Sequence, residues 1–535
     1  MQKLLVANRG EIAVRIFRAC REHGLASVAV VAPDDRGSLH ARRADEVVEI
    51  ASYLDAGEHV RAAVETGADA VHPGYGFLAE SADLAEAVIG AGLTWVGPPP
   101  EALRLGGDKL RAKEIALQSG VPVLPTGTAE EVGLPLVVKA AAGGGGRGMR
   151  VVRSMDELED GVAAARREAA AAFGDDTVFF ERYLERPRHV EIQLLADSHA
   201  TVVALGERDC SIQRRHQKVL EESPAVGPAL RARMSDAAVA FARAIGYVSA
   251  GTAEFVVEGD EFFFLELNAR IQVEHPVTEL VTGVDIVREQ LRIAEGAELV
   301  PRLDVQGHAV EVRLYAEDPR TFLPQAGRIA RLRLPAGVRV DAGVEEGDEI
   351  GTSYDPMIAK LIAHGRTRHH AFEQLARALD ETVVEGVTTN LPFLRWLVTH
   401  PLVREGQVTT AFLTEHPPLS EHAPTPPARV WAGAWRLNLA PPAPQPVPTL
   451  DGGGAGDSGG AEQSTLTAPM PGTVIKVLVE AGASVRARQP LVVLEAMKME
   501  TPLVSPYDAT VRAVHVAEGD RVAGGTVLVE LDSAT

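Results

Sequence analysis

The chain has 535 residues, 46% of them hydrophobic, and a formal net charge of −21 at pH 7. This length predicts three or four domains, and the interspersed acidic and basic residues exclude the basic face of a nucleic-acid-binding protein. The only cysteines, Cys20 and Cys210, exclude a disulfide framework and a cysteine-rich zinc site and favour a reducing cytosol. The apolar run within residues 1–10 is too short for a signal peptide. No apolar run in the chain approaches the roughly 18 residues of a membrane helix.

Residues 1–110 alternate short apolar runs with helical patterns. Strands are expected at Lys3–Ala7 and Ser27–Ala32, with a helix at Glu11–His23 between them. This alternation of strand, helix and strand predicts a parallel sheet with helical crossovers.

A glycine-rich loop follows a helix expected at Lys109–Ser119. The loop, Gly143–Gly146, joins a strand at Pro135–Lys139 to a second strand at Met149–Val152. Bare backbone N–H groups in such a loop bind phosphate oxygens, and Lys139 adds a positive charge. The pattern is neither a dinucleotide-binding fingerprint nor a P-loop. These residues alone support a phosphate-binding loop and a flexible hairpin tip equally well.

Polar side chains occur on two neighbouring predicted strands further along the chain. Glu254 lies on the first strand, and Glu266 and Asn268 lie on the second, where a period of two places them opposite Phe263 and Leu265. The strands are expected at Gly251–Phe255 and Phe262–Asn268. Two carboxylates and an amide oxygen are ligands suited to Mg²⁺.

The polar residues Arg270, Gln272, Glu274 and His275 follow this second strand directly. So many charged and polar groups beside an aromatic strand would be costly to bury without a ligand. The segment therefore favours a binding site over a purely structural cluster of ion pairs.

Three longer motifs resemble the signatures of biotin carboxylase, an ATP-grasp enzyme. They are GYGFLAE at Gly74–Glu80, ERDCSIQRRHQK at Glu207–Lys218 and NARIQVEHP at Asn268–Pro276. The resemblance extends from Lys3 to Glu415. It implies an α/β and α+β architecture: an N-terminal α/β domain over 1–110, an ATP-grasp domain with a glycine-rich lid over 111–320, and a C-terminal domain over 321–416.

The resemblance implies that ATP, bicarbonate and biotin give ADP, phosphate and carboxybiotin. Glu274 matches the general base that activates bicarbonate, and Arg339 matches the residue that stabilises the biotin enolate. The residues that would bind bicarbonate are Lys218, Arg270, Gln272 and the backbone of Val273. Mg²⁺, or Mn²⁺ in its place, would be held by Glu254, Glu266 and Asn268. The nucleotide would contact Lys109, Lys139, Gly143, Gly144, Gly145, Gly146, Glu181, Arg182, Tyr183, Leu184, His189 and His216.

Proline and glycine dominate residues 417–464, which predicts a linker that lets the following domain move. Beyond it, Gly472–Gly482 is echoed by Ala509–Gly519 at a constant offset, which also relates Leu491 to Leu528. A repeat of short strands cannot bury its apolar face alone, so two such units predict a small flattened β-barrel over 465–535.

Lys498 lies where the two repeats join, in the segment EAMKME at Glu495–Glu500. Strand-like runs flank it, which predicts a hairpin turn that presents the lysine to solvent. An ordinary surface lysine is the simplest interpretation, but Ala-Met-Lys-Met resembles the biotin attachment site of biotinyl carrier domains. A lipoyl domain has the same fold, and the paired methionines argue against it. Covalent biotin on Lys498 is therefore expected.

Carboxylase and carrier together resemble the α-subunit of a two-component acyl-CoA carboxylase. This resemblance implies a carboxyltransferase β-subunit and a biotin protein ligase as partners, a homo-oligomer formed through the carboxylase region, a cytoplasmic location, and no nucleic-acid or membrane partner. The chain lacks the β-barrel that docks the β-subunit in the longest relatives.

The final acceptor stays open among acetyl-CoA, propionyl-CoA, a branched enoyl-CoA and pyruvate, because the sequence contains no carboxyltransferase domain. Pyruvate would make this chain part of a two-subunit pyruvate carboxylase. The bicarbonate motif and the methionine-flanked Lys498 disfavour a different ATP-grasp ligase fused to a carrier. A non-catalytic carrier scaffold is disfavoured because Glu274, Lys218 and Arg270 are all present.

Overall fold

The computed structural model describes residues 1–141, 149–173, 175–214, 217–300, 304–419, 465–468, 472–496, 499–522 and 525–533. The chain divides into two compact units. The larger consists of Met1–Ala316, Gly327–Glu349 and Met357–Pro418, and the smaller of Glu317–Ala326, Ile350–Pro356 and Leu419–Thr535. Across these described residues, no helix has both the length and the apolar character needed to cross a membrane.

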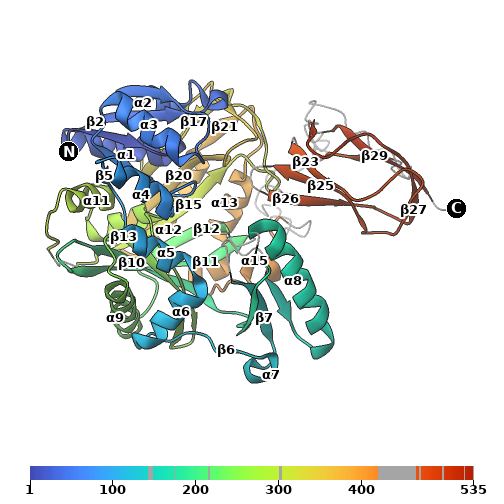
Figure 1. Cartoon of the computed structure of the whole chain (residues 1–535), viewed down its shortest axis with the longest axis horizontal. Coiled ribbons are helices and arrows are strands. Elements are labelled where there is room, and N and C mark those ends of the chain that lie inside the picture. Colours follow the sequence, from blue (N-terminus) through green and yellow to red (C-terminus); the bar gives the residue numbers. More distant parts are fainter. Residues whose placement is uncertain are drawn as a thin grey trace, which may run out of the picture. The chain divides into compact units, whose positions relative to one another are not determined.

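A parallel sheet of five strands begins the larger unit, in the order β3-β2-β1-β4-β5 (Figure 1). Its strands are β1 (Lys3–Val6), β2 (Ala26–Val31), β3 (Glu46–Glu49), β4 (Ala70–His72) and β5 (Thr94–Trp95). The helices of this region are α1 (Gly10–His23), α2 (Leu39–Arg43), α3 (Ala56–Thr66), α4 (Ala82–Gly90) and α5 (Pro100–Gly107). Parallel neighbours require such crossovers, and the predicted parallel sheet is confirmed.

A smaller antiparallel sheet has the order β6-β9-β7-β8 and is covered by α8 (Leu158–Phe173). Its strands are β6 (Thr126–Gly127), β7 (Leu136–Ala140), β8 (Arg150–Val152) and β9 (Val178–Arg182), and the helices α6 (Lys109–Gln118) and α7 (Ala129–Val132) precede it. Leu136, Val138 and Val152 are buried against α8, while Lys139 and Glu181 point to the other side. The glycine loop between β7 and β8 lies outside the described residues.

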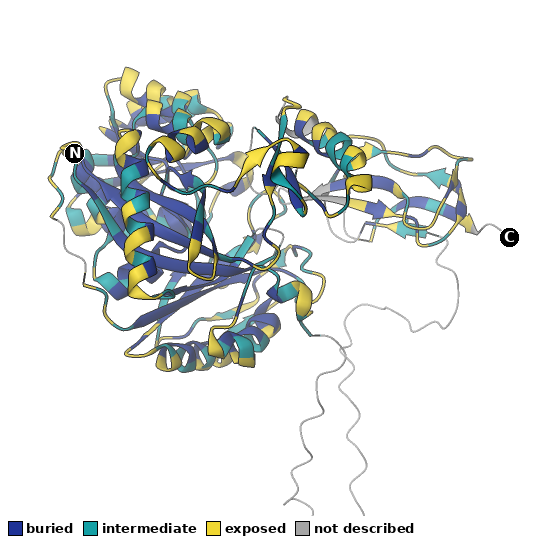
Figure 2. Cartoon of the chain, turned by 90° about the horizontal axis from the view of Figure 1, so that it is seen from below, coloured by how far each residue is buried: buried dark blue, intermediate teal, exposed yellow. Residues whose placement is uncertain are grey.

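A sheet of eight strands forms the centre of the larger unit, in the order β14-β13-β10-β11-β12-β15-β20-β18. Figure 2 shows most of this sheet in the colour of buried residues, and its two edge strands are only partly buried. The strands are β10 (Arg188–Ala196), β11 (Val202–Arg214), β12 (Gln217–Ser223), β13 (Ser249–Glu258), β14 (Glu261–Asn268), β15 (His308–Tyr315), β18 (Arg339–Ala342) and β20 (Met357–Gly365).

Helices pack on this sheet, and two pairs of short strands border it. The helices are α9 (Pro228–Ala244), α10 (His275–Thr282), α11 (Ile286–Ala294), α12 (Arg368–Glu381), α13 (Leu391–Thr399), α14 (Pro401–Glu405) and α15 (Phe412–Glu415). The short strands are β16 (Gly327–Arg328) with β19 (Glu349–Ile350), and β17 (Arg331–Arg333) with β21 (Val383–Glu385). Val277 and Val281 of α10 pack on Ala309 and Ile362, so the apolar face of α10 holds the segment before it against the sheet.

A β-bulge on β14 changes the alternation that the sequence predicts. The register shifts by one residue between the pairs Glu254–Glu266 and Phe255–Phe264. Phe262, Phe264 and Leu267 are consequently the buried apolar residues of β14, whereas Phe263 and Leu265 are only partly buried. The extra residue lets the aromatic part of β14 face the core while Glu266 and Asn268, near the end of the strand, face the polar residues that follow it.

The C-terminal strands of the smaller unit form two four-stranded sheets, β22-β29-β27-β24 and β26-β25-β23-β28. The strands are β22 (Thr465–Thr467), β23 (Gly472–Val477), β24 (Ser484–Val485), β25 (Pro490–Ala496), β26 (Met499–Val504), β27 (Ala509–Val514), β28 (Arg521–Val522) and β29 (Val527–Ser533). Strand β23 pairs with β28 and the equivalent β27 pairs with β24, so the two repeats exchange their short strands. Leu491 and Leu528, at matching positions, are both fully buried. The predicted flattened β-barrel is confirmed.

Candidate active site

A cluster of buried polar and charged side chains surrounds Lys218 of β12, its central cation. Its Nζ donates hydrogen bonds to Glu191 at 2.5 Å, Glu254 at 2.8 Å and Glu274 at 2.7 Å. Burial alone would lower the pKa of Lys218, but these three carboxylates raise it well above its usual value. Lys218 is therefore charged at neutral pH and joins three strands and a loop at one point.

Glu274 immediately precedes α10, and its side chain does not cap that helix. The carboxylate instead accepts hydrogen bonds from Lys218 on one oxygen and from Arg313 of β15, at 3.0 Å, on the other. Burial alone would raise the pKa of Glu274, but Lys218 and Arg313 hold it well below its usual range. A buried but ionised carboxylate results, which is the state that a general base requires.

Glu254 and Glu266 face each other directly across β13 and β14, and Asn268 is the next residue on the same side of β14. Burial and the charge of Glu254 raise the pKa of Glu266. A divalent cation would relieve this repulsion, and the carboxylate and amide oxygens are ligands that Mg²⁺ prefers. The three predicted metal ligands therefore fit Mg²⁺.

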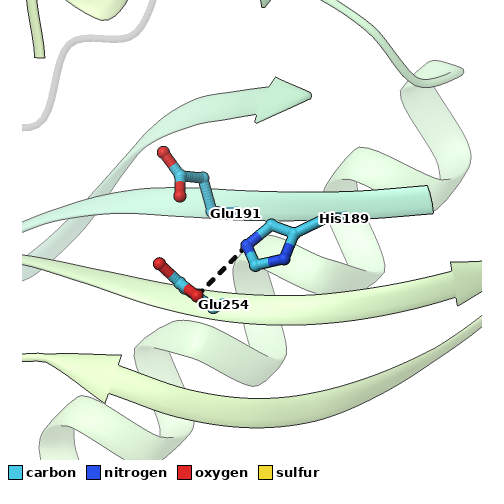
Figure 3. A group of neighbouring side chains, drawn as sticks. All are labelled: His189, Glu191 and Glu254. Carbon is cyan, nitrogen blue, oxygen red and sulfur yellow. Dashed lines mark ion pairs between the residues drawn. The ribbon is translucent and has the colours of Figure 1, made fainter. Parts of the chain in front are cut away.

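His189, Glu191 and Glu254 form a second group whose ligand atoms lie within 4.8 Å of one another (Figure 3). The His189 Nε2 lies 3.1 Å from the Glu254 carboxylate. The ammonium group of Lys218 already bonds to both Glu191 and Glu254. A lysine thus supplies the positive charge at this point, and the group is not assigned as a metal site.

Apart from Lys218, the predicted bicarbonate residues occupy one segment between β14 and α10. Gln272 donates from its amide nitrogen to Glu254 at 2.9 Å. Arg270 pairs with Glu80 at 3.1 Å and donates to Asn268 at 2.8 Å. The carbonyl of Val273 accepts a hydrogen bond from Lys360 at 2.6 Å. The structure thus brings this segment to the predicted metal ligands and, through Glu274 and Glu254, to Lys218.

The predicted nucleotide residues lie partly on the smaller sheet. Glu181 of β9 is fully buried and forms ion pairs with Lys139 of β7 and with Lys113 of α6. Lys109, at the start of α6, acts electrostatically on Glu266 and so links this region to the carboxylate pair. Arg182 is the last residue of β9, and Tyr183 and Leu184 follow it. Gly143–Gly146 and His216 lie outside the described residues.

Arg339 of β18 contacts the helix that follows Glu274. Its guanidinium group donates to Glu279 of α10 at 2.6 Å and to Asp341, two residues along β18, at 2.8 Å. A different arginine, Arg313, bonds to Glu274 itself and also forms an ion pair with Glu221 of β12 at 2.5 Å. The role of Arg339 in stabilising the biotin enolate stays a prediction.

Other buried cations were not predicted from the sequence, among them Lys113, Arg313 and Lys360. Lys360 is fully buried, and its ammonium group lies 3.3 Å from Glu11 of α1. A weak signal existed for Lys360, which interrupts the apolar run of β20. Nothing in the local sequence names the partners that these residues find across the sheet.

The fold and this site together define an ATP-dependent ligase of the ATP-grasp type. Family models match the described domains in order: "Biotin carboxylase, N-terminal domain" at 1–103, "Carbamoyl-phosphate synthase L chain, ATP binding domain" at 125–301 and "Biotin carboxylase C-terminal domain" at 311–415. "Biotin-requiring enzyme" matches 464–531. The predicted fold class is confirmed.

Relatives of known identity agree with these matches. The "Biotin-dependent acyl-coenzyme A carboxylase alpha3 subunit" of Mycobacterium leprae is 43% identical over 99% of this chain and 98% of the relative. The biotin carboxylase of Haemophilus influenzae is 48% identical over 76% of this chain and 95% of its own. The biotin carboxylase domain of the Hydrogenobacter thermophilus 2-oxoglutarate carboxylase, solved with MgADP, ADP and bicarbonate, superimposes with a TM-score of 0.76 at 42% identity, covering 78% of this chain and 98% of that domain.

The chain belongs to the biotin carboxylase family, in a form that carries a biotin-requiring domain after the carboxylase. It is an ATP-dependent biotin carboxylase with biotin, ATP and Mg²⁺ as its cofactors.

Proposed function

We propose that this chain uses ATP and bicarbonate to carboxylate biotin held on its own Lys498, and that it supplies a separate carboxyltransferase subunit which acts on an acyl-CoA. The observation that supports the first half is the ionised Glu274, which lies between two buried cations and beside the predicted metal ligands. Lys498 and Met497 lie outside the described residues; the strands β25 and β26 on either side pair up to Ala496 and Met499.

The residues of the cluster suit the carboxylase half-reaction. Glu274 takes the proton of bicarbonate as a bicarbonate oxygen attacks the γ-phosphoryl group of ATP. Lys218, Arg270, Gln272 and the backbone N–H of Val273 bind and orient the anion, since cations and N–H donors match its oxygens. Mg²⁺ held by Glu254, Glu266 and Asn268 would neutralise phosphoryl charge. Lys109, Lys139, His189 and the segment from Glu181 to Leu184 would bind the nucleotide.

Arg339 would stabilise the biotin enolate, the role that the family resemblance implies for it. Proton removal from the ureido group of biotin places negative charge on the ureido oxygen, and a fixed cation stabilises that charge. Glu279 and Asp341 hold the guanidinium group of Arg339, which keeps 18% of its side chain exposed. Arg313 instead holds the catalytic carboxylate of Glu274.

The acyl-CoA acceptor is supported by the full-length relative, which is named as an acyl-CoA carboxylase subunit and is matched over both the carboxylase and the carrier regions. Other relatives are subunits of methylcrotonoyl-CoA and propionyl-CoA carboxylases. A pyruvate acceptor is the alternative, because one subunit of the pyruvate carboxylase of Methanothermobacter thermautotrophicus is 46% identical over 77% of this chain. We also propose a biotin protein ligase as a partner, self-association through the carboxylase region and a cytoplasmic location, which the cysteine usage favours.

One experiment tests both halves. The biotinylated chain is assayed for ATP cleavage with bicarbonate present or absent and with free biotin as the acceptor. The partner subunit is then isolated by affinity capture from its natural source and supplied with acetyl-CoA, propionyl-CoA, a branched enoyl-CoA and pyruvate in turn. Bicarbonate-dependent cleavage supports the carboxylase half, and its absence refutes it. If pyruvate is the only one of these acceptors to be carboxylated, the pyruvate carboxylase alternative replaces the acyl-CoA proposal.

A further inference from the structure

Arg208 of β11 is a fully buried arginine with a hydrogen-bond acceptor for every donor that it has. Its Nε donates to Glu191 at 2.6 Å, and one terminal nitrogen donates to Gln193 at 2.7 Å and Thr278 at 2.8 Å. The other terminal nitrogen donates to Gln272 at 2.9 Å and Thr252 at 3.4 Å. A guanidinium group has five N–H donors, and all five are used. No other side chain has this number and geometry of donors.

Two of these five acceptors act on the residues that we propose bind bicarbonate. Gln272 is one of those residues itself. Glu191 is fully buried, and its second oxygen accepts the hydrogen bond from Lys218. Arg208 therefore holds Gln272 directly and holds Lys218 through Glu191, while Gln193, Thr252 and Thr278 anchor the guanidinium group to β10, β13 and α10.

Arg208 also decides which end of the Gln272 amide faces the catalytic cluster. A side-chain amide can be turned either way, with oxygen or nitrogen toward a given neighbour. A guanidinium group only donates, so the amide oxygen must face Arg208. The NH₂ group must then face Glu254 and the anion site, where a donor attracts bicarbonate and an amide oxygen would repel it.

We propose that Arg208 is a positioning residue for bicarbonate, which fixes the Gln272 amide with its NH₂ group toward the anion and, through Glu191, fixes Lys218. This inference rests on the proposed function of the site. It assigns a role in the reaction to a residue that touches neither substrate nor metal. The consequence is specific, because neither contact involves the lysines and the segment near Glu181 that we propose bind the nucleotide.

The test compares Arg208→Lys with Thr278→Val. Lysine keeps the charge but has three donors and no planar fork, so it cannot hold Gln272 and Glu191 together. Thr278→Val removes one acceptor of the same guanidinium group and leaves both bicarbonate-side contacts intact. KM for bicarbonate is measured at saturating MgATP and free biotin, and KM for ATP at saturating bicarbonate. Thermal unfolding of each variant is followed in parallel.

Arg208→Lys should raise the KM for bicarbonate about tenfold or more, the effect expected when a hydrogen bond to a charged group is lost. Its KM for ATP should stay within about twofold of the wild-type value, because the substitution is not expected to weaken the binding of both substrates alike. Thr278→Val should lower thermal stability without changing either KM. If Arg208→Lys keeps a normal KM for bicarbonate, or if both KM values rise together as stability falls, the proposal is overturned.

Glu191→Gln gives an independent measurement if Arg208→Lys does not fold. Glutamine still accepts from Arg208, but it turns an NH₂ group toward the ammonium group of Lys218. KM for bicarbonate should again rise about tenfold, with KM for ATP little changed. A normal bicarbonate KM in Glu191→Gln overturns the link to Lys218. Absence of bicarbonate-dependent ATP cleavage in the wild type would instead refute the proposed function, so the two failures are distinguishable.

Discussion

Replacing Arg313 with glutamine tests how far the catalytic carboxylate of Glu274 depends on its second cation. Arg313 forms a 3.0 Å hydrogen bond with Glu274 and a 2.5 Å ion pair with Glu221. Glutamine keeps hydrogen-bonding ability but removes the charge, so two buried carboxylates lose the cation between them. The perturbation should therefore affect both stability and catalysis, and the two effects can be separated.

For stability, removing one partner of a buried ion pair costs about 3–5 kcal/mol. For catalysis, Glu274 keeps Lys218 but loses the donor to its other oxygen, and a misplaced catalytic group lowers the rate by about 10²-fold. The double variant Arg313→Gln, Glu221→Gln removes the cation together with one of its two carboxylates. It should recover much of the lost stability, because only Glu274 is then left without Arg313, and Lys218 still pairs with it.

The assay is carboxylation of free biotin at pH 8 with saturating ATP and bicarbonate, together with thermal unfolding. Both variants that lack Arg313 should be about 10²-fold slower than the wild type. Arg339→Gln is the comparison variant: its contacts are with Glu279 and Asp341, so Glu274 keeps both cations, and the rate should fall by about 10²–10³-fold through loss of the charge proposed to stabilise the biotin enolate. A rate that recovers with stability in the double variant would refute a direct role of Arg313, and a normal rate in Arg339→Gln would refute the enolate assignment.

Four further outcomes are expected. Lys498→Ala, coexpressed with a biotin ligase, should lack the biotin mass increment in intact mass spectrometry, and retention of the increment would exclude Lys498. Glu274→Gln should bind ATP normally, measured by titration, but lose bicarbonate-dependent ATP cleavage by at least about 10²-fold; a near-normal rate would place the base elsewhere. Deleting Pro424–Pro444 should spare carboxylation of free biotin but slow transfer to a β-subunit, because a short tether lowers the effective concentration at the second site; full overall turnover would show that the linker is not the tether. Burial holds the pKa of Glu221 at about 7, above its ordinary value, so the unfolded chain loses this proton first and stability falls as pH rises from 5 to 8. The stability of the wild type relative to Glu221→Gln should therefore fall by up to about 3 kcal/mol between pH 5 and pH 8, and a pH-independent difference would contradict this.

The sequence alone is sufficient for those parts of the site that lie close together along the chain. Gln272, Glu274 and the pair Glu266 and Asn268 fall within one short segment, and their residue types and spacing are enough to indicate a metal and anion site. The internal repeat likewise predicts the barrel, because equivalent strands must bury equivalent faces. Local pattern and fold agree in these regions.

The remainder of the site depends on pairing across the sheet, which local patterns do not encode. Arg313 lies 39 residues from Glu274 and contacts it only because β15 pairs with β12. Arg208 and Lys360 likewise find acceptors on elements distant in sequence. The bulge on β14 shifts the predicted alternation at Phe263 and Leu265 by one position, since a single extra residue reverses every side chain beyond it.

The sharing of Glu254 has a thermodynamic consequence for the order in which ligands bind. This carboxylate accepts from Lys218 and Gln272, and it is also a proposed magnesium ligand. The single negative charge of Glu254 cannot fully neutralise a divalent cation while the carboxylate also accepts hydrogen bonds from both donors. Once Glu254 turns to the metal, Lys218 and Gln272 gain free donor capacity for an anion beside them. Metal–nucleotide and bicarbonate should therefore bind with positive cooperativity, and linkage requires each to raise the affinity of the other by the same factor.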